Sequence, residues 1–105
     1  METTIGVNIL CKTAKEQFLF LEAKNGQEYY KDYFSRIGFK EIIDKYYFLY
    51  YGINCKHHFN SDGTVLNAII IEIHNEKGFN KNALKSELKL YIENYFNDLF
   101  GKFKN

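Results

Sequence analysis

A four-residue segment in the middle of the chain, Asn60-Ser61-Asp62-Gly63, constrains the fold more than any other feature. Asn and Asp side chains bond to nearby backbone groups, and Gly adopts positive φ without steric cost, so this combination is typical of a chain reversal. The flanking runs, Ile53–Phe59 and Thr64–His74, are rich in the β-branched and aromatic residues that strands favour. They predict an antiparallel hairpin in which Phe59 pairs with Thr64, with Tyr46–Tyr51 as a third strand.

Alternation of apolar and small or polar residues predicts another strand over Thr4–Cys11. Its apolar members share one face: Ile5, Val7, Ile9 and Cys11. A short strand over Phe39–Asp44 is also predicted, leading into the aromatic run. An isolated acid between isoleucines, Glu72, is expected on the solvent face of its strand.

A capping box predicts a helix after the first strand. The spacing in Thr13-Ala14-Lys15-Glu16 lets the Thr hydroxyl and the Glu carboxylate each bond a backbone N–H, which favours a helix over Ala14–Lys24. Phe18 and Leu21 would then share its buried stripe. The short apolar run around them leaves a strand open as the alternative.

The C-terminal segment predicts a long amphipathic helix, capped by Asn80 or Asn82 and ending near Gly101. Its predicted buried stripe consists of Leu84, Leu88, Tyr91, Tyr95 or Phe96, Leu99 and Phe103. We therefore expect one α+β domain over residues 1–105. In it, an antiparallel sheet of three to five strands carries this helix and one or two N-terminal helices.

The second N-terminal helix is predicted to begin at Gln27 and to stop at Gly38. With the Gly-Phe-Lys that ends it, the segment Glu28–Ile43 resembles the helix-to-strand step of vicinal-oxygen-chelate proteins and acetyltransferases. The resemblance implies a small enzyme or small-ligand-binding protein with a cleft between sheet and helices. The chain departs from both families, because Thr4–Cys11 carries no His or Glu ligand and no Gly-rich turn cradles a phosphate.

Composition argues against several classes of function. The 14 basic and 13 acidic residues nearly cancel, so the chain has no bulk attraction for nucleic acid or anionic lipid, and its single arginine, Arg36, further disfavours nucleic acid. Two cysteines are too few for a disulfide framework and favour reduced thiols in a cytoplasmic protein. No apolar run reaches the roughly 18 residues of a membrane span, and the N-terminus lacks a signal-peptide pattern.

Cys55, His57, His58 and His74 are of the residue types that bind zinc. On a strand, however, Cys55 and His57 share one face and His58 takes the other. Neither a further ligand nor a third residue that would orient the His57 imidazole beside a Cys55 nucleophile is evident. We therefore expect no cofactor and no catalytic residue, with Cys55 and His57 as the remaining candidate metal ligands.

The run Tyr46–Tyr51 is aromatic on both faces of a strand. Either it is a central strand buried on both faces, or one row of tyrosines is exposed, Tyr46 with Tyr50 or Tyr47 with Tyr51. Exposed tyrosines are typical anchors of protein interfaces. The expected partner-binding residues are Tyr46, Tyr47, Tyr50, Tyr51, Lys56 and His58.

The leading functional hypothesis is accordingly a non-enzymatic inhibitor that binds one partner protein. An immunity or antitoxin protein that occludes a toxin or nuclease fits best. A residue usage heavy in Lys, Asn, Ile, Tyr and Phe indicates an AT-rich gene, as many bacterial and phage defence genes are. The alternatives are the ligand-binding cleft above and a homodimer that pairs edge strands.

Overall fold

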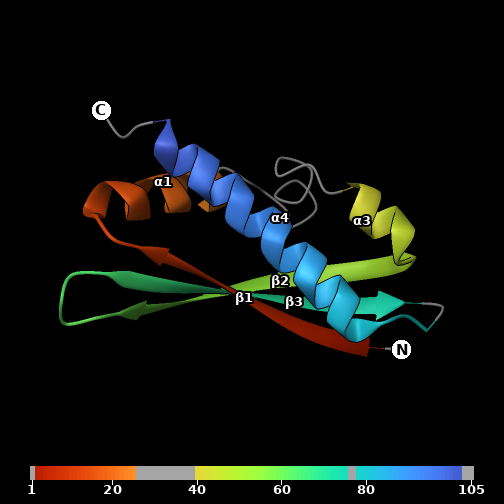
Figure 1. The fold of residues 1–105 in the computed structure, drawn as a ribbon. Helices are drawn as coiled ribbons and strands as arrows, with labels where there is room; N and C mark the ends of the chain where they lie inside the picture. Colours follow the sequence, from red (N-terminus) through yellow and green to blue (C-terminus); the bar gives the residue numbers. More distant parts are fainter. Residues whose placement is uncertain (1, 26–39, 76–77, 103–105) are drawn as a thin grey trace.

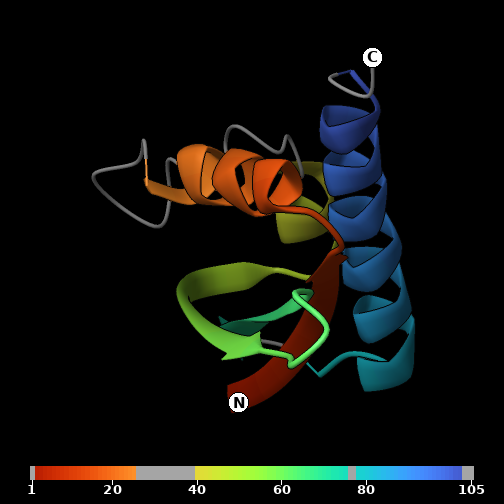
Figure 2. The ribbon, with the colours of Figure 1, turned by 90° about the vertical axis from the view of Figure 1, so that its left-hand side faces the viewer.

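The computed structural model describes residues 2–25, 40–75 and 78–102 (Figure 1). Along the chain, its elements are β1 (Glu2–Cys11), α1 (Ala14–Asn25), α3 (Lys40–Lys45), β2 (Phe48–Phe59), β3 (Val65–Asn75) and α4 (Lys81–Gly101). The three strands form one antiparallel sheet in the order β1-β3-β2. Figures 1 and 2 show α1 and α4 on the same side of this sheet, which confirms the predicted α+β arrangement.

Strand β1 pairs with β3 without interruption, from Glu2 opposite His74 to Cys11 opposite Val65. Every second residue of β1 is buried against the helices, and the residues between are exposed. The predicted alternation over Thr4–Cys11 is therefore confirmed, although the strand begins two residues earlier. The helix-facing residues of β3 are buried in the same way, and Glu72 on its other face is exposed as expected.

The predicted hairpin turn is confirmed, but its register differs by one residue from the prediction. Gly63 has φ +90°, the Asn60 amide donates to the Thr64 carbonyl at 2.9 Å, and the Asp62 carboxylate accepts from the Thr64 amide at 2.9 Å. These bonds hold Thr64 in the turn, so pairing begins one residue later than predicted: Phe59 lies opposite Val65. In consequence His57 lies opposite Asn67 rather than Leu66.

Two predicted strands are wrong. The segment predicted as Phe39–Asp44 is helical from Lys40 onward, in α3, which buries Ile42. Tyr46–Tyr51 is not a separate strand, because Tyr46 and Tyr47 form a turn and the following residues begin β2, which continues through Gly52. The strand half of the resemblance in Glu28–Ile43 is therefore absent. The rest of that segment and the helix predicted from Gln27 to Gly38 lie outside the described residues.

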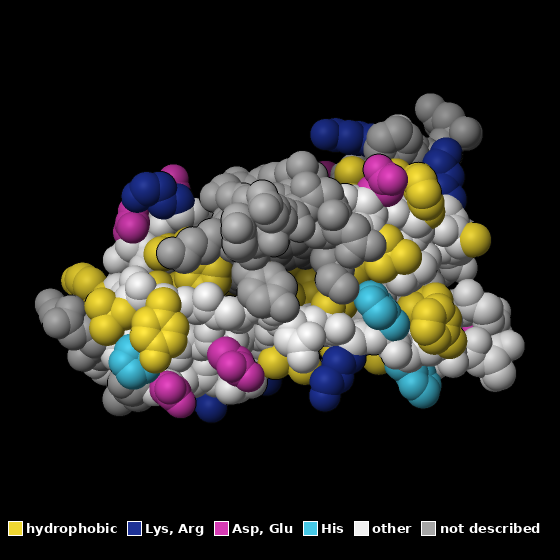
Figure 3. Space-filling model, turned by 180° about the vertical axis from the view of Figure 1, so that it is seen from behind, with side chains coloured by type: hydrophobic (Ala, Val, Ile, Leu, Met, Phe, Trp, Pro, Cys, Tyr) yellow, Lys and Arg dark blue, Asp and Glu magenta, His cyan; other side chains and the backbone are white. Residues whose placement is uncertain are grey.

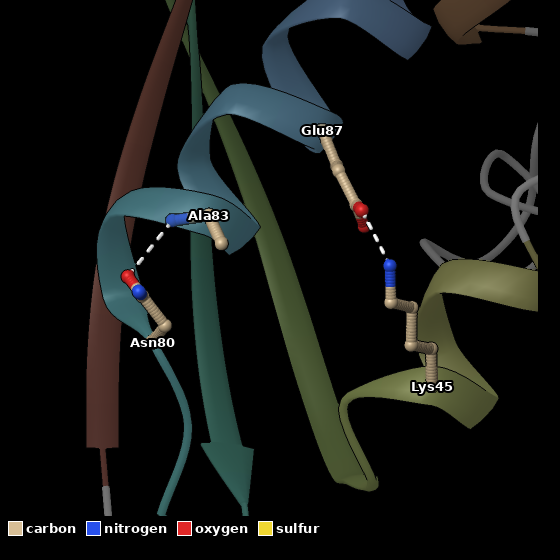
Figure 4. A network of polar contacts seen from close by, with 4 residues as sticks. All are labelled: Lys45, Asn80, Ala83 and Glu87. Atoms are coloured by element: carbon tan, nitrogen blue, oxygen red, sulfur yellow. Dashed lines mark hydrogen bonds and ion pairs between the residues drawn. The ribbon is translucent and has the colours of Figure 1, made fainter.

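Helix α4 covers the sheet with a row of side chains spaced by four: Leu84, Leu88, Ile92, Phe96 and Phe100. The prediction was right for Leu84, Leu88 and Phe96 but missed the other two. Tyr91, Tyr95 and Leu99 are only half-buried beside this row, and Phe103 lies outside the described residues. Asn80 caps the helix, accepting from the Ala83 amide at 3.1 Å (Figure 4).

Helix α1 confirms the predicted helix but presents a different aromatic face. The Thr13 hydroxyl accepts from the Glu16 amide at 3.1 Å, while the Glu16 carboxylate accepts from the Lys12 amide at 2.7 Å. Phe20 is fully buried and packs on Phe96 of α4, with ring centroids 4.8 Å apart. Phe18, predicted to be buried, is 60% exposed.

Among the described residues, no helix combines the length and the apolar composition that crossing a lipid bilayer requires.

Candidate docking surface

The two faces of the sheet differ in how they are covered. The helices of the described residues all lie over one face (Figures 1 and 2). On the opposite face, the side chains of the edge strand β1 are exposed, and most of those on the edge strand β2 are too. Seen from behind, hydrophobic side chains lie beside histidines at both ends of the molecule (Figure 3).

The start of β2 breaks the regular alternation of the strand. Phe48 lies opposite Asn75 and Tyr50 opposite His74, so Leu49 is an extra residue that forms a β-bulge. Because the bulge resets the alternation, two consecutive residues face solvent: Leu49 and Tyr50 are each 56% exposed. A bulge thus explains how two large apolar side chains come to stand side by side on the surface.

Tyr47, directly before the bulge, is also exposed and has a strained backbone. It is 55% exposed, and its φ of +56° is the only positive value at a non-glycine residue in the described part of the chain. For a bulky residue this left-handed conformation costs about 1–3 kcal/mol. We name Tyr47, Leu49 and Tyr50 the Tyr47–Tyr50 patch.

The predicted rows of tyrosines are wrong in their pairing. Tyr46 is only 8% exposed and packs edge-on against Phe79, with centroids 6.1 Å apart, and Tyr51 is half-buried. The exposed members are thus Tyr47 and Tyr50, one from each predicted row. The rows were counted along a continuous strand, whereas a turn and a bulge interrupt the segment. The alternative of a central strand buried on both faces is also wrong, because β2 lies at an edge of the sheet that the described residues form and most side chains of its outer face are exposed.

Lys56 and His58 lie on the outer face of β2 and are exposed, as a partner-binding residue must be. The structure does not bring them to the patch, however. Lys56 follows Tyr50 by six positions on the same strand, which is about 20 Å at the usual rise of a strand. Whether any of the predicted residues contacts a partner stays a prediction.

Beside the patch, a cleft opens over the outer face of the sheet. It is lined by Glu2, Thr3, Thr4, Tyr50, Tyr51, Gly52, Glu72 and His74, and we name it the Glu72 cleft. The rings of Tyr50 and His74 stack in parallel, with centroids 4.7 Å and planes 3° apart. The Glu2 carboxylate lies 3.9 Å from Nδ1 of His74. The cleft therefore combines an aromatic wall with two carboxylates, and no Lys or Arg is among the described residues that line it.

Sequence reasoning missed Glu2 and Glu72 as members of a site, and it considered His74 only as a zinc ligand. Glu2 precedes Glu72 and His74 by 70 residues or more in the chain, and only the strand register brings the three residues together. Tyr50 and Glu2 both lie opposite His74, one from each neighbouring strand. The pairing of Tyr50 with His74 could have been found had the hairpin register been predicted correctly, because Phe59 opposite Val65 places Tyr50 opposite His74.

The candidate metal ligand His57 belongs to a polar network on the helix-covered face. Asn67 is fully buried, and its Nδ2 donates to Gln17 Oε1 at 2.8 Å and to Cys11 Sγ at 3.3 Å. Its Oδ1 accepts from Gln17 Nε2 at 3.1 Å and lies 2.6 Å from Nδ1 of His57. Because an amide oxygen can only accept, His57 donates from Nδ1. The network satisfies a buried amide in the core.

The environment of Cys11 is not that of an activated nucleophile. Burial, with the nearby charge of Glu16, raises the pKa of Cys11 to about 11, so its thiol stays protonated at neutral pH. Cys55 is half-buried on the same face as His57. In the described part of the chain, no group of three or more His, Cys, Asp or Glu side chains could hold a metal ion.

Comparison with known proteins yields no relative: no protein-family model matches the sequence, and neither does any curated protein or solved structure. The class is therefore defined by the structure alone. It is an α+β domain whose described helices cover one face of a three-stranded antiparallel sheet. At the beginning of β2 it carries an exposed apolar patch beside an acidic cleft.

Proposed function

We propose that this protein is a non-enzymatic inhibitor that binds one partner protein through the Tyr47–Tyr50 patch. An immunity or antitoxin protein that occludes a toxin or nuclease is the specific form we favour. The observation that supports the proposal is the patch itself. Its three large apolar side chains lie within four positions of the chain, and each is more than half exposed. Aromatic side chains at such positions are the usual energetic anchors of protein interfaces.

The backbone at the patch supports the same proposal. A bulge and a left-handed tyrosine both cost local stability, and such features persist mainly where they orient side chains for a function. A solvent-exposed Gly at position 47 would turn the chain with less strain, and a regular strand would bury one of Leu49 and Tyr50. The observed arrangement therefore gives up stability and gains an outward-facing apolar surface.

The proposed setting is the cytoplasm. Cys11 and Cys55 are both present as thiols rather than joined in a disulfide, and the formal net charge is only +1. The inhibitor would act sterically, covering the active site or docking surface of its partner, and needs no catalytic residue of its own.

Capture of the partner from the native host tests the proposal. A tagged full-length chain should retain one stoichiometric protein whose toxic activity is suppressed in the complex. The Tyr47→Ala/Tyr50→Ala variant should bind that protein at least about tenfold more weakly, because two interface anchors are removed. Its unfolding midpoint should stay within a few degrees of that of the unmodified chain.

Leu90→Ala is the matched control. Leu90 is 61% exposed on α4, so the change removes comparable apolar surface outside the patch. It should leave the affinity unchanged. Equal capture by the tyrosine variant and the control would overturn the assignment of the patch, and a captured protein without suppressible activity would overturn the inhibitory function.

A further inference from the structure

The carboxylates of Glu2 and Glu72 line the Glu72 cleft together with the imidazole of His74. Among the described residues, no Lys or Arg belongs to this lining. Glu2 is 82% exposed, and Glu72 is also exposed. The Glu2 carboxylate forms an ion pair with Nδ1 of His74, 3.9 Å away, only when that imidazole is protonated, and Glu72 has no ion pair within the described residues. The described lining therefore places two carboxylates directly beside an apolar patch.

Resting on the function proposed above, we propose that the Glu72 cleft receives an arginine side chain of the partner protein. A guanidinium is flat and cationic, and it can stack on an aromatic ring while donating hydrogen bonds to carboxylates. The cleft offers both: the ring of Tyr50, more than half exposed, and the carboxylates of Glu2 and Glu72. The Tyr47–Tyr50 patch would contact the apolar surface around that arginine.

The shape of the cleft suits a flat group. Gly52 lies opposite Glu72 on the neighbouring strand, and a side chain there would meet no atom within 4 Å. The sheet is thus bare next to the carboxylate, so that a planar cation can approach the backbone closely. Nδ1 of His74 is shielded from solvent and has no hydrogen-bond partner in the described residues.

Other occupants fit the same residues less well. A metal ion needs a convergent set of ligands, and the described residues provide no group of three. A phosphate or carboxylate would be repelled by the two glutamates. Proteins that act on phosphodiester substrates commonly present arginine at the substrate site, so an arginine-directed cleft fits an inhibitor that occludes a nuclease.

A titration with a small arginine probe tests the inference directly. The full-length chain, labelled with ¹⁵N, is titrated with N-acetyl-L-arginine amide and, separately, with N-acetyl-L-citrulline amide, which has nearly the same shape but no charge. The arginine probe should shift the backbone amide signals of Tyr50, Gly52, Glu72 and His74 in a saturable way. The citrulline probe should not.

Two variants separate the cleft from general charge. Glu72→Gln should weaken binding of the arginine probe at least severalfold, because it removes a carboxylate and keeps the size of the side chain. Glu22→Gln, which neutralises an exposed acid on α1, should leave binding unchanged. Equal effects of the two variants, or shifts of equal size with both probes, would overturn the inference.

The outcome is independent of the test of the proposed function. If the arginine probe fails to bind the cleft while Tyr47→Ala/Tyr50→Ala abolishes capture of the partner, the inhibitor function stands and the arginine assignment is wrong. If the probe binds as expected but the tyrosine variant still captures the partner, the patch assignment is wrong, and so is the inference that Tyr50 stacks on an arginine of that partner.

Discussion

A turn precedes β2 and another follows it, and the two turns consist of different kinds of residues. At its C-terminal end the chain turns through Asn60–Gly63, where Gly63 takes φ +90° and Asp62 and Asn60 bond to Thr64. At its N-terminal end the chain turns through Tyr46 and Tyr47, where a tyrosine takes φ +56° and a bulge follows at once. One end uses the residues that a turn favours, and the other places a bulky aromatic side chain in a strained position.

The two turns also differ in the side chains that they expose. The turn at Gly63 consists of small and polar residues. The turn at Tyr47 exposes three large apolar side chains, which in solution have nothing to gain from exposure. The turn at Gly63 joins β2 to β3, whereas Tyr47 directly follows α3 and its amide donates to the Asp44 carbonyl at 3.3 Å. A left-handed residue at the end of a helix is usually glycine, so a tyrosine there adds backbone strain, for which the proposed binding role would account.

The largest expected effect contrasts a buried with an exposed leucine. Leu88 is fully buried in α4, so Leu88→Ala should lower the free energy of unfolding by about 2–5 kcal/mol. Leu49 in the bulge is 56% exposed, so Leu49→Ala should change it by less than about 1 kcal/mol. Urea unfolding of both variants checks this. A comparable loss for the two would show that the bulge is part of the core.

A smaller effect is expected at the hairpin turn. Gly63→Ala should destabilise the protein by about 1–2 kcal/mol, because an L-residue is strained at positive φ. No atom lies within 4 Å of the added Cβ, so the cost comes from the backbone alone. Thermal unfolding measures it. No change in the midpoint would mean that this turn relaxes to another conformation, which would weaken its contrast with Tyr47.

The turn after the C-terminal end of β2 could be predicted because the residues that stabilise it lie within it: Asn and Asp bond the local backbone, and Gly adopts positive φ. The alternation in β1 likewise predicts which face of that strand is buried. The register was missed by one residue because Thr64 is held by side-chain bonds to Asp62 and Asn60. This error of one residue placed His57 opposite Leu66 in the prediction, whereas it lies opposite Asn67 in the structure.

The N-terminal end of β2 was not predictable in this way. All six residues of Tyr46–Tyr51 are aromatic or leucine, so no local signal marks a turn or a bulge. The turn depends on distant contacts: the Asn75 side chain donates to the Tyr46 carbonyl, and the Tyr46 ring packs on Phe79. The candidate surface was therefore predicted in its segment and partly in its residues, but not in its geometry.

Relief of strain at Tyr47 gives a still smaller effect of opposite sign. Tyr47→Gly should raise the free energy of unfolding by at most about 1 kcal/mol, because glycine tolerates positive φ but loses more conformational entropy on folding. The same variant should weaken capture of the partner, since an anchor is lost. Denaturant unfolding and the capture experiment measure the two effects. A variant that is destabilised would mean that the Tyr47 side chain supports the fold.

The smallest effect is expected from the ion pair that joins α3 to α4 next to the patch. Lys45 Nζ lies 2.6 Å from the Glu87 carboxylate, with both side chains more than one-third exposed (Figure 4). The Lys45 hydrogen bond lowers the pKa of Glu87, so the pair stabilises the fold above the ordinary Glu pKa of 4.5 and this contribution is lost as the pH falls through the lowered value.

Because the pair is solvent-exposed and screened by salt, Glu87→Gln should barely change the unfolding midpoint at neutral pH. It should also leave partner capture intact, since the bulge and the Tyr47 turn, rather than α3, orient the patch. The midpoint of the variant, measured from pH 7 to pH 3, should approach that of the unmodified chain at the acidic end. Loss of capture in Glu87→Gln would instead show that the position of α3 determines the exposed tyrosines, and the contrast between the two ends of β2 would then extend beyond the strand.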